Sequence, residues 1–590
     1  MRNRKHILLF LLLAAVTTTA FAKDDYQSPF SIVKIVTTLR VAADASYETV
    51  TEYRQKIETP VGAQDYGEIP IEYSGSQETL EVLEAYTLQP DGKRINVPES
   101  AIMDKGDAIG ESASMFSDTR QKVIIYPDVR PGSQLYFKTR LVRHTAEFPG
   151  HFIYEDYFSP HYRSGHEEIN LIVSDKLPVH IDTKGMQGGR LPDKNGYQHY
   201  RYVFKQETAL PTEPSQVNYR DFAPYFMAST FVDQAALGRA YQERAKPMTK
   251  VTPAIQKLAD AITLNTDNKR EQAKALYHWV AKNIRYVSIS LGSGGLVPRP
   301  AQATLDNRYG DCKDYVALLE ALLDAKGIES SPALINLGDA YQLPKLAVIS
   351  PMNHVITYIP SLDLYLDATA QFAPFGALPE EDMDKPVILT ALNRLGRTPI
   401  LRASDHLLKS EVRLRMLADG SIEGTSATKA TGWWEAGFRQ ARFNSMHSPN
   451  DSLIRGRLSD YKETGAGKIL SNDPHDFDQP YGESTSFTLD PLSNIPGPAA
   501  TAIPVGPLFY SLADIKKPRD QLNFPDTCGT GTMQEHYVLE FPNNIRIKSI
   551  PVDANYDNGV TSYTSRYKLD GLKLDVTREL QTNRLSMVCG

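Results

Sequence analysis

Hydrophobic residues follow two different spacings along this chain. From about Ser31 to Phe204 they recur at every second position in short runs, such as Leu80–Tyr86 and Gln134–Arg140, with turn signals at 90–92 and 131–132. A period of two is typical of half-buried strands, and short strands with frequent turns favour an antiparallel β-sandwich. We therefore predict an N-terminal β-sandwich domain over residues 23–225 and a linker over 226–250.

Helical spacing begins at Thr252, a good N-cap residue that is followed by Pro253 at the first helical position. Two further helices are expected, one before residue 284 and one that starts near Cys312 and ends at Gly327. Extended runs follow at 333–337, 354–359 and 362–367. This mixture predicts an α+β core over 251–385, and the return of alternation beyond it predicts a mainly β C-terminal domain over 386–590, interrupted by a helix at 433–443.

Length and charge fit an ordinary multidomain protein. The 590 residues are enough for three or four domains, at roughly 100–200 residues each. The 64 basic and 71 acidic residues give a net charge of −7, so we expect no nucleic-acid partner.

The first residues are typical of an export signal. Arg2, Arg4 and Lys5 precede an apolar run at 7–16, and Ala20 and Ala22 have the spacing that signal peptidase requires. We predict a signal peptide over 1–22, no stable membrane span after its cleavage, and an exported chain. The periplasm is the expected location, with secretion or a cell-surface location as the alternatives.

The chain has three cysteines, Cys312, Cys528 and Cys589. An odd number leaves at least one unpaired in an oxidising compartment. Cys528 and Cys589 both lie in the strand-rich tail, and a disulfide between them would stabilise the fold by up to about 4 kcal/mol on the chain-entropy argument. We therefore predict this pair as the disulfide and Cys312 as the free thiol.

Cys312 occupies a position that suits a nucleophile. It follows Asp311, a good N-cap, and the dipole at a helix N-terminus favours the thiolate. The alternative is a buried structural cysteine.

Acyl transfer by a thiolate also needs a base and a group that orients the base. His354 starts one extended run and Asp367 ends another. If Pro360 and Ser361 form a tight turn, the two strands pair so that His354 faces Asp367, with Cβ atoms about 4.5–5.5 Å apart. A longer loop is the alternative, and each residue alone also fits an ordinary strand position.

Three motifs in order resemble the transglutaminase-like superfamily, in its bacterial secreted branch: Tyr309–Tyr315, Asn353–Val355 and Tyr365–Thr369. The segments Trp279–Tyr286 and Pro300–Leu305 fit the same pattern, and the resemblance covers roughly residues 250–385. The β-rich region before it is similar in layout to the domain of unknown function that often precedes such domains.

The resemblance implies a papain-like α+β core. In it, Cys312 is the nucleophile, His354 the general base and acid, and Asp367 the orienting residue, and amide bonds are cleaved or exchanged through a thioester. It also implies one oxyanion donor at the backbone N–H near Cys312. Tyr286 and Gln302 are candidates for the second donor, with ordinary packing or solvation as the alternative for each. We expect no cofactor, and no calcium-loop pattern occurs.

Other chemical patterns are weaker. Four histidines at 144, 151, 161 and 166, with the acids at 167 and 168, match no zinc spacing, so we expect no metal. Trp433 and Trp434 are more typical of a core than of a ligand groove. Lys313 and Asp314 are expected to be surface charges of their helix.

The leading hypothesis is an exported cysteine enzyme that acts on amide bonds of a protein or peptide in the cell envelope, by hydrolysis or by transfer to an amine. The alternative is a non-catalytic envelope protein that uses its β domains to bind protein or polysaccharide.

Overall fold

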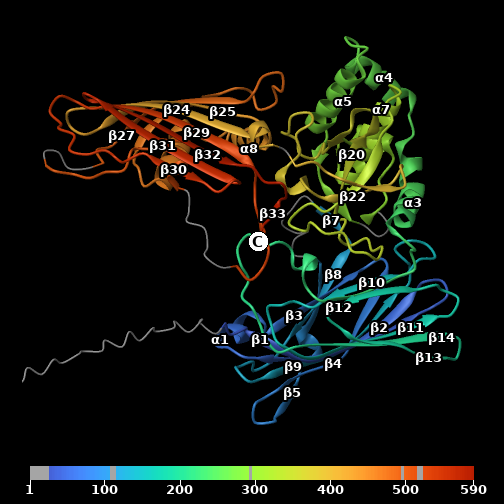
Figure 1. The fold of residues 1–590 in the computed structure, drawn as a ribbon. Helices are drawn as coiled ribbons and strands as arrows, with labels where there is room; N and C mark the ends of the chain where they lie inside the picture. The colour runs from blue at the N-terminus through green and yellow to red at the C-terminus, as the bar shows by residue number, and fades with distance from the viewer. Residues whose placement is uncertain are drawn as a thin grey trace, which may run out of the picture.

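The computed structural model describes residues 26–106, 115–290, 295–400, 402–492, 497–514 and 522–589. The predicted signal peptide lies outside these residues, as do positions 291–294 of the glycine-rich segment that precedes Pro298. Figure 1 shows three parts, a β-rich N-terminal domain, a central mixed domain and a β-rich C-terminal domain, with the end of the chain between them.

The N-terminal domain is built on an eight-stranded sheet with the order β13-β14-β11-β1-β2-β9-β4-β5, to which two three-stranded sheets are added. Most neighbours are antiparallel, but β1 pairs with β11 in parallel, a departure from a purely antiparallel sheet. Its elements are β1 (Phe30–Val41), β2 (Tyr47–Ile57), α1 (Pro60–Asp65), β3 (Glu68–Ser74), β4 (Glu78–Leu88), β5 (Arg94–Asn96), β6 (Ile102–Gly106), β7 (Met115–Ser117), β8 (Thr119–Ile125), β9 (Gln134–Arg143), β10 (Ile153–Tyr157), β11 (Ser164–Ser174), β12 (His180–Lys184), β13 (Gln187–Lys194), β14 (Tyr197–Gln206) and β15 (Tyr225–Ser229).

The central domain packs helices against a five-stranded sheet with the order β21-β20-β19-β22-β23. Its elements are α3 (Gln234–Ala245), α4 (Pro253–Ile262), α5 (Lys269–Asn283), β16 (Arg285–Tyr286), β17 (Ser288–Ser290), α6 (Ala301–Asn307), β18 (Tyr309–Gly310), α7 (Cys312–Asp324), β19 (Ser331–Ile335), β20 (His354–Ile359), β21 (Leu364–Leu366), β22 (Pro386–Leu389) and β23 (Arg394–Arg397).

Helix α7 is the centre of this domain. Its residues from Lys313 to Leu323 are all buried, and it contacts α4, α5, α6 and β20. A helix that is apolar on most sides belongs inside a core, and this one has neighbours on several sides. As a result, the first turn of α7 is fixed next to the sheet that carries His354.

Two predicted boundaries of the central domain are wrong. The segment 226–250 is not a linker, because β15 lies between β10 and β12 in a three-stranded sheet of the N-terminal domain, and α3 packs on β22 and β23. The core also does not end at residue 385, because β22 pairs with β19 and β23 pairs with β22. The sequence between β15 and α4 is polar and contains proline, so its local pattern does not predict these tertiary contacts.

The C-terminal domain is a second eight-stranded sheet, ordered β26-β27-β25-β24-β29-β32-β31-β30. Residues 545–550, which alternate in sequence, are not a strand. Its elements are β24 (Leu407–Met416), β25 (Ile422–Ala430), α8 (Trp433–Asn444), α9 (Asn450–Asp460), β26 (Gly465–Ser471), β27 (Gly482–Leu489), β28 (Asp526–Thr527), β29 (Gly531–Glu540), β30 (Ala554–Asp557), β31 (Thr561–Asp570), β32 (Lys573–Thr582) and β33 (Val588–Cys589).

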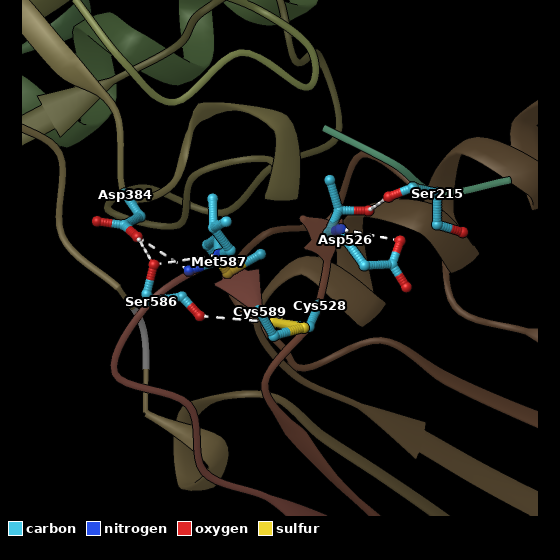
Figure 2. The surroundings of a disulfide bond; sticks show 9 residues. Ser215, Asp384, Asp526, Cys528, Ser586, Met587 and Cys589 are labelled. Atoms are coloured by element: carbon cyan, nitrogen blue, oxygen red, sulfur yellow. Dashed lines mark hydrogen bonds between the residues drawn. A yellow bond between two sulfur atoms is a disulfide. The ribbon is translucent and has the colours of Figure 1, made fainter. Parts of the chain in front are cut away.

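The end of the chain returns to the central domain. Cys528 and Cys589 form a disulfide with a Cα–Cα distance of 6.1 Å, and Cys312 is free. Figure 2 shows that Met587, beside this disulfide, donates its backbone N–H to Asp384 of the central domain, over 2.9 Å. The Met587 side chain is 1% exposed and packs with Val387 and other core residues. The tail is thereby anchored on the central core. Among the described residues, the longest apolar helices fall short of what a membrane crossing requires.

Candidate active site

Cys312 is the first residue of α7, and its helix start is tightly capped. The Asp311 side chain accepts a hydrogen bond from the backbone of Asp314, and the Asp314 side chain accepts one from the backbone of Asp311. Arg299 holds Asp314 through its backbone N–H at 2.8 Å and through its guanidinium at 2.9 and 3.0 Å. The partly exposed Cys312 thiol therefore lies at a rigid helix N-terminus, where backbone N–H groups favour an anion.

The prediction that Lys313 and Asp314 are surface charges is wrong. Lys313 is 7% exposed and forms an ion pair with Asp311, and Asp314 is 1% exposed. Buried charges need partners, and these residues have them in the cap itself. A charged pair after a cysteine looks like a solvated helix face in sequence, so only the packing around α7 reveals the difference.

Gly310 lets the chain approach this cap. It lies in β18, which pairs in parallel with β16 so that Gly310 faces Tyr286. A Cβ atom at position 310 would lie 2.6 Å from the Cβ of Asp314, closer than real side chains pack. Glycine is therefore needed at this position for the capping box to form as it does.

The two other predicted catalytic residues meet beside this helix. His354 begins β20, and its Nε2 lies 3.1 Å from Oδ2 of Asp367. The other oxygen of Asp367 accepts hydrogen bonds from the backbone and the hydroxyl of Thr369, at 2.8 and 2.7 Å. Both residues are almost fully buried. The Tyr277 hydroxyl of α5 donates to the carbonyl of Asp367 at 3.1 Å, so both the backbone and the side chain of Asp367 are held.

The turn between the two strands differs from the prediction. Pro360–Leu362 form a 3-10 turn, Asp363 follows in the left-handed region, and Ile359 faces Leu364 rather than Leu362. The register is thus displaced by two residues. Because side chains alternate between faces with a period of two, this displacement leaves His354 and Asp367 on one side of the sheet. The ladder ends at Thr357, so Asp367 reaches His354 from just beyond the paired strands.

Electrostatics favour a charged histidine at this site. Burial opposes the imidazolium, but the Asp367 carboxylate and a hydrogen bond with Cys312 raise the pKa of His354 well above its ordinary value. Burial likewise opposes the carboxylate, but His354 and Thr369 lower the pKa of Asp367. Since Nε2 of His354 faces Asp367, Nδ1 is the nitrogen left for the thiol. The arrangement suits a thiolate and imidazolium pair.

The two oxyanion candidates are placed differently. Tyr286 pairs with Gly310, two residues before Cys312, and is 42% exposed. Partial burial, and next the interaction with Cys312, raise the pKa of its hydroxyl, which can donate a hydrogen bond near the thiol. Gln302 lies on α6, where its side chain accepts from Thr252 at 2.5 Å and donates to Asp306 at 2.7 Å. The structure therefore brings Tyr286, and not Gln302, to the surroundings of Cys312.

A buried acid that the sequence analysis did not single out, Asp382, lies beside His354 and Asp367. Asp382 is fully buried, and one oxygen or nitrogen of each of Asp382, Asp367 and His354 lies within 4.8 Å of the others. In sequence it ends an acidic run, Glu380–Asp382, that resembles a solvated loop. Within the described ranges, these three residues are the one trio with donor atoms close enough for a metal ion. An ion there would compete with His354 for the Asp367 carboxylate.

The histidines of the N-terminal domain are dispersed. His161 is engaged with the carbonyl of Leu210 at 2.9 Å, and His166 with the carboxylate of Glu168 at 3.2 Å. They join no trio of possible metal ligands among the residues that the structure covers.

Two family models match the chain. Residues 43–211 match a domain of unknown function, DUF3857, and residues 256–358 match the transglutaminase-like superfamily. No curated protein sequence matches the chain significantly. The second match contains Cys312 and His354 but ends before Asp367 and Asp382.

One solved structure shares the whole architecture. A candidate protease from Parabacteroides distasonis matches 95% of this chain and 94% of its own, with a TM-score of 0.67 and 14% sequence identity. A candidate cysteine protease from Cytophaga hutchinsonii has 17% identity and a TM-score of 0.17, over 34% of this chain and 66% of its own. A zinc metallopeptidase from Deinococcus radiodurans has 12% identity and a TM-score of 0.20, over 34% and 42%. The Parabacteroides structure shares the fold of this chain: an N-terminal β-rich domain, a central core, which here matches the transglutaminase-like superfamily, and a C-terminal β-rich region.

Proposed function

We propose that this chain, whose residues 256–358 belong to the transglutaminase-like superfamily, is an exported cysteine enzyme that acts on amide bonds of a protein or peptide. The observation that carries the proposal is the arrangement of Cys312, His354 and Asp367. A free thiol lies at a capped helix start and in contact with an imidazole whose pKa is raised, and a buried carboxylate orients that imidazole. Each of these features favours a nucleophilic thiolate.

The reaction follows from the charges. The Cys312 thiolate attacks the amide carbonyl, and a carbon–sulfur bond forms. As the carbon–nitrogen bond breaks, the His354 imidazolium gives its proton to the leaving amine, and the acyl group remains on Cys312 as a thioester. Water or a second amine then loses a proton to His354 and attacks the thioester, which releases the product and restores the thiolate and imidazolium.

The tetrahedral intermediate carries an oxyanion that needs hydrogen-bond donors. The backbone N–H groups at the start of α7 supply one kind of donor, because a first helical turn leaves them unpaired by the helix itself. The Tyr286 hydroxyl is the second donor in our proposal. A tyrosine hydroxyl is protonated at neutral pH, and partial burial together with Cys312 raises the pKa of Tyr286 further.

Export and location complete the proposal. The basic residues, the apolar run and the small residues at 20 and 22 support a signal peptide over 1–22, and the Cys528–Cys589 disulfide suits an oxidising compartment. We propose the periplasm as the location and an envelope protein or peptide as the substrate.

A direct test compares wild-type protein with Cys312→Ala on an envelope protein extract, with release of new amines or ammonia and formation of crosslinks as the readouts. We expect loss of at least about 10³-fold in activity, since no other group can form the thioester. His144→Ala, which changes an exposed histidine of the N-terminal domain, serves as the matched control and should retain full activity. Activity that survives in Cys312→Ala would refute the proposal. An inert wild type would favour a binding or scaffold protein.

A further inference from the structure

The position of Asp382 is set by its backbone. It ends a 3-10 turn, Glu380–Asp382, in which its N–H donates to the carbonyl of Pro379 at 3.1 Å. Its own carbonyl accepts a hydrogen bond from the hydroxyl of Thr398. The side chain is therefore delivered to the interior beside Asp367 by a fixed piece of chain.

The carboxyl group of Asp382 lacks the partners that an ionised acid requires. It is completely shielded from solvent, and neither of its oxygens accepts a hydrogen bond from a donor among the described residues. A buried carboxylate without donors is strongly unfavourable, whereas a neutral carboxylic acid carries its own donor. An oxygen of the Asp367 carboxyl lies within 4.8 Å, which makes Asp367 the nearby acceptor.

Two adjacent buried carboxyl groups do not both ionise. Asp367 accepts hydrogen bonds from Thr369 and lies against Nε2 of His354, so it is the better site for the negative charge. Asp382 is therefore the member of the pair that keeps a proton. Burial and the charge of Asp367 raise the pKa of Asp382 well above its ordinary value, which agrees with this assignment. The other titratable groups around it are Glu381, Lys385 and the Tyr277 hydroxyl.

We propose that Asp382 is a fourth member of the site, a positioning residue that stays protonated and donates its O–H to the carboxylate of Asp367. The bond fixes the carboxylate on the side that faces His354, and it shares the negative charge between the two acids without adding a second one. His354 then keeps one orientation toward Cys312. This role rests on the proposed function, because it acts on the enzyme only through the triad.

Three variants of the full chain separate the roles of the donor and of the charge. Asp382→Asn retains a neutral donor, and Asp382→Ala removes it. Asp384→Asn is the matched control, because Asp384 is a neighbouring acid whose pKa is lowered, whereas the pKa of Asp382 is raised. Burial opposes its charge, but Arg397 and the backbone of Met587 lower the pKa of Asp384.

The first readout is thermal stability against pH. A group with a raised folded-state pKa contributes its full stability below its ordinary pKa, 3.8 for an aspartate, and loses it as the pH rises. Asp382→Asn should therefore melt above the wild type at pH about 7, and the difference should vanish near pH 4. Asp384→Asn should show the opposite sign, because a lowered pKa gives stability above 3.8 that is lost as the pH falls.

The second readout is the rate of Cys312 alkylation against pH. Asp382→Asn should reproduce the wild-type profile, and Asp382→Ala should react about tenfold more slowly at the pH optimum, the cost of one hydrogen bond to a charged group. If Asp382→Ala does not fold, the Asn variant decides, since a profile that coincides with that of the wild type supports the proposal. An alkylation profile displaced toward lower pH in Asp382→Asn, or a melting temperature below that of the wild type at pH about 7, would show an ionised Asp382 and overturn it.

Two further outcomes would also overturn the proposal. Wild-type rates in a folded Asp382→Ala would show that Asp382 has no positioning role. A loss of wild-type stability in EDTA that is absent from Asp382→Asn would identify a bound cation in place of the proton. An unreactive Cys312 in the wild type would instead defeat the proposed function, while the stability readout would still decide the protonation of Asp382.

Discussion

At the scale of the residue, the site depends on how two buried groups, His354 and Asp367, share charge. The Asp367 carboxylate raises the pKa of His354 against the effect of burial, and His354 in turn lowers the pKa of Asp367. The sequence around each residue gives no sign of a shifted pKa. Their proximity in the core gives them their properties, with Thr369 and Tyr277 holding Asp367 in place.

Asp367→Asn tests this dependence. Loss of the carboxylate removes the main group that raises the pKa of His354. The imidazolium should therefore lose its proton at a lower pH, and the alkaline limb of the activity profile should move to lower pH. We expect kcat to fall by about 10²–10⁴-fold, as for an orienting aspartate in other triads. A pH–rate series on the variant provides the measurement.

The matched control is Asp363→Asn, in the turn of the same hairpin, where the side chain accepts a hydrogen bond from Tyr358 at 2.8 Å. It should leave the alkaline limb in place. An equal change in both variants would mean that the effect comes from the hairpin and not from the triad.

At the scale of the element, α7 has to start at Cys312 and nowhere else. Three features fix that start: the capping box of Asp311 and Asp314, the hydrogen bonds from Arg299, and the absence of a side chain at Gly310. A shift of one residue in the register of α7 against its neighbours would rotate the thiol by about 100°, away from His354.

Gly310→Ala should disturb this start. The added Cβ would meet Asp314 at 2.6 Å, so we expect a loss of about 1–3 kcal/mol in the free energy of unfolding together with slower Cys312 alkylation. Gly437→Ala is the control, because a Cβ at Gly437 of α8 meets nothing within 4 Å and should stabilise by up to about 1 kcal/mol. Chemical denaturation of both variants gives the comparison, and a neutral Gly310→Ala would contradict this account of the cap.

Local signals predicted the elements well and their packing less well. Thr252 caps α4 and Asp311 caps α7, as the sequence indicates, because a cap is a local interaction. Residues far away in sequence determine three other features: the hairpin register, the burial of Lys313 and the place of Asp382. No local pattern marks them, and an acidic run such as Glu380–Asp382 resembles solvent-exposed loop sequence.

At the scale of the whole molecule, distant segments meet at the central domain. Strand β7 of the N-terminal domain pairs with β17, and the C-terminal tail contacts both other domains through Thr527 and Met587. Thr527 donates its backbone N–H to the carbonyl of Ser215 at 2.7 Å. The disulfide holds the two tail segments that make these contacts.

Reduction of the disulfide should therefore weaken the central domain as well as the tail. We expect Cys528→Ser with Cys589→Ser to lower the free energy of unfolding by about 2–4 kcal/mol and to increase hydrogen exchange at Met587 and at β22. A reductant should have the same effect on the wild type and none on the double variant. Exchange that increases only within the C-terminal sheet would contradict the anchoring role of the tail.

The central claim is that Cys312 is a thiolate paired with His354. The most direct measurement is the rate of Cys312 alkylation in the native full chain as a function of pH, with peptide mapping to identify the cysteine. The account predicts rapid alkylation at pH about 5, well below the ordinary thiol pKa of about 8.5, and its loss in His354→Ala but not in His144→Ala. A Cys312 that reacts only near the ordinary thiol pKa, or only after denaturation, and equally in His354→Ala, would contradict it.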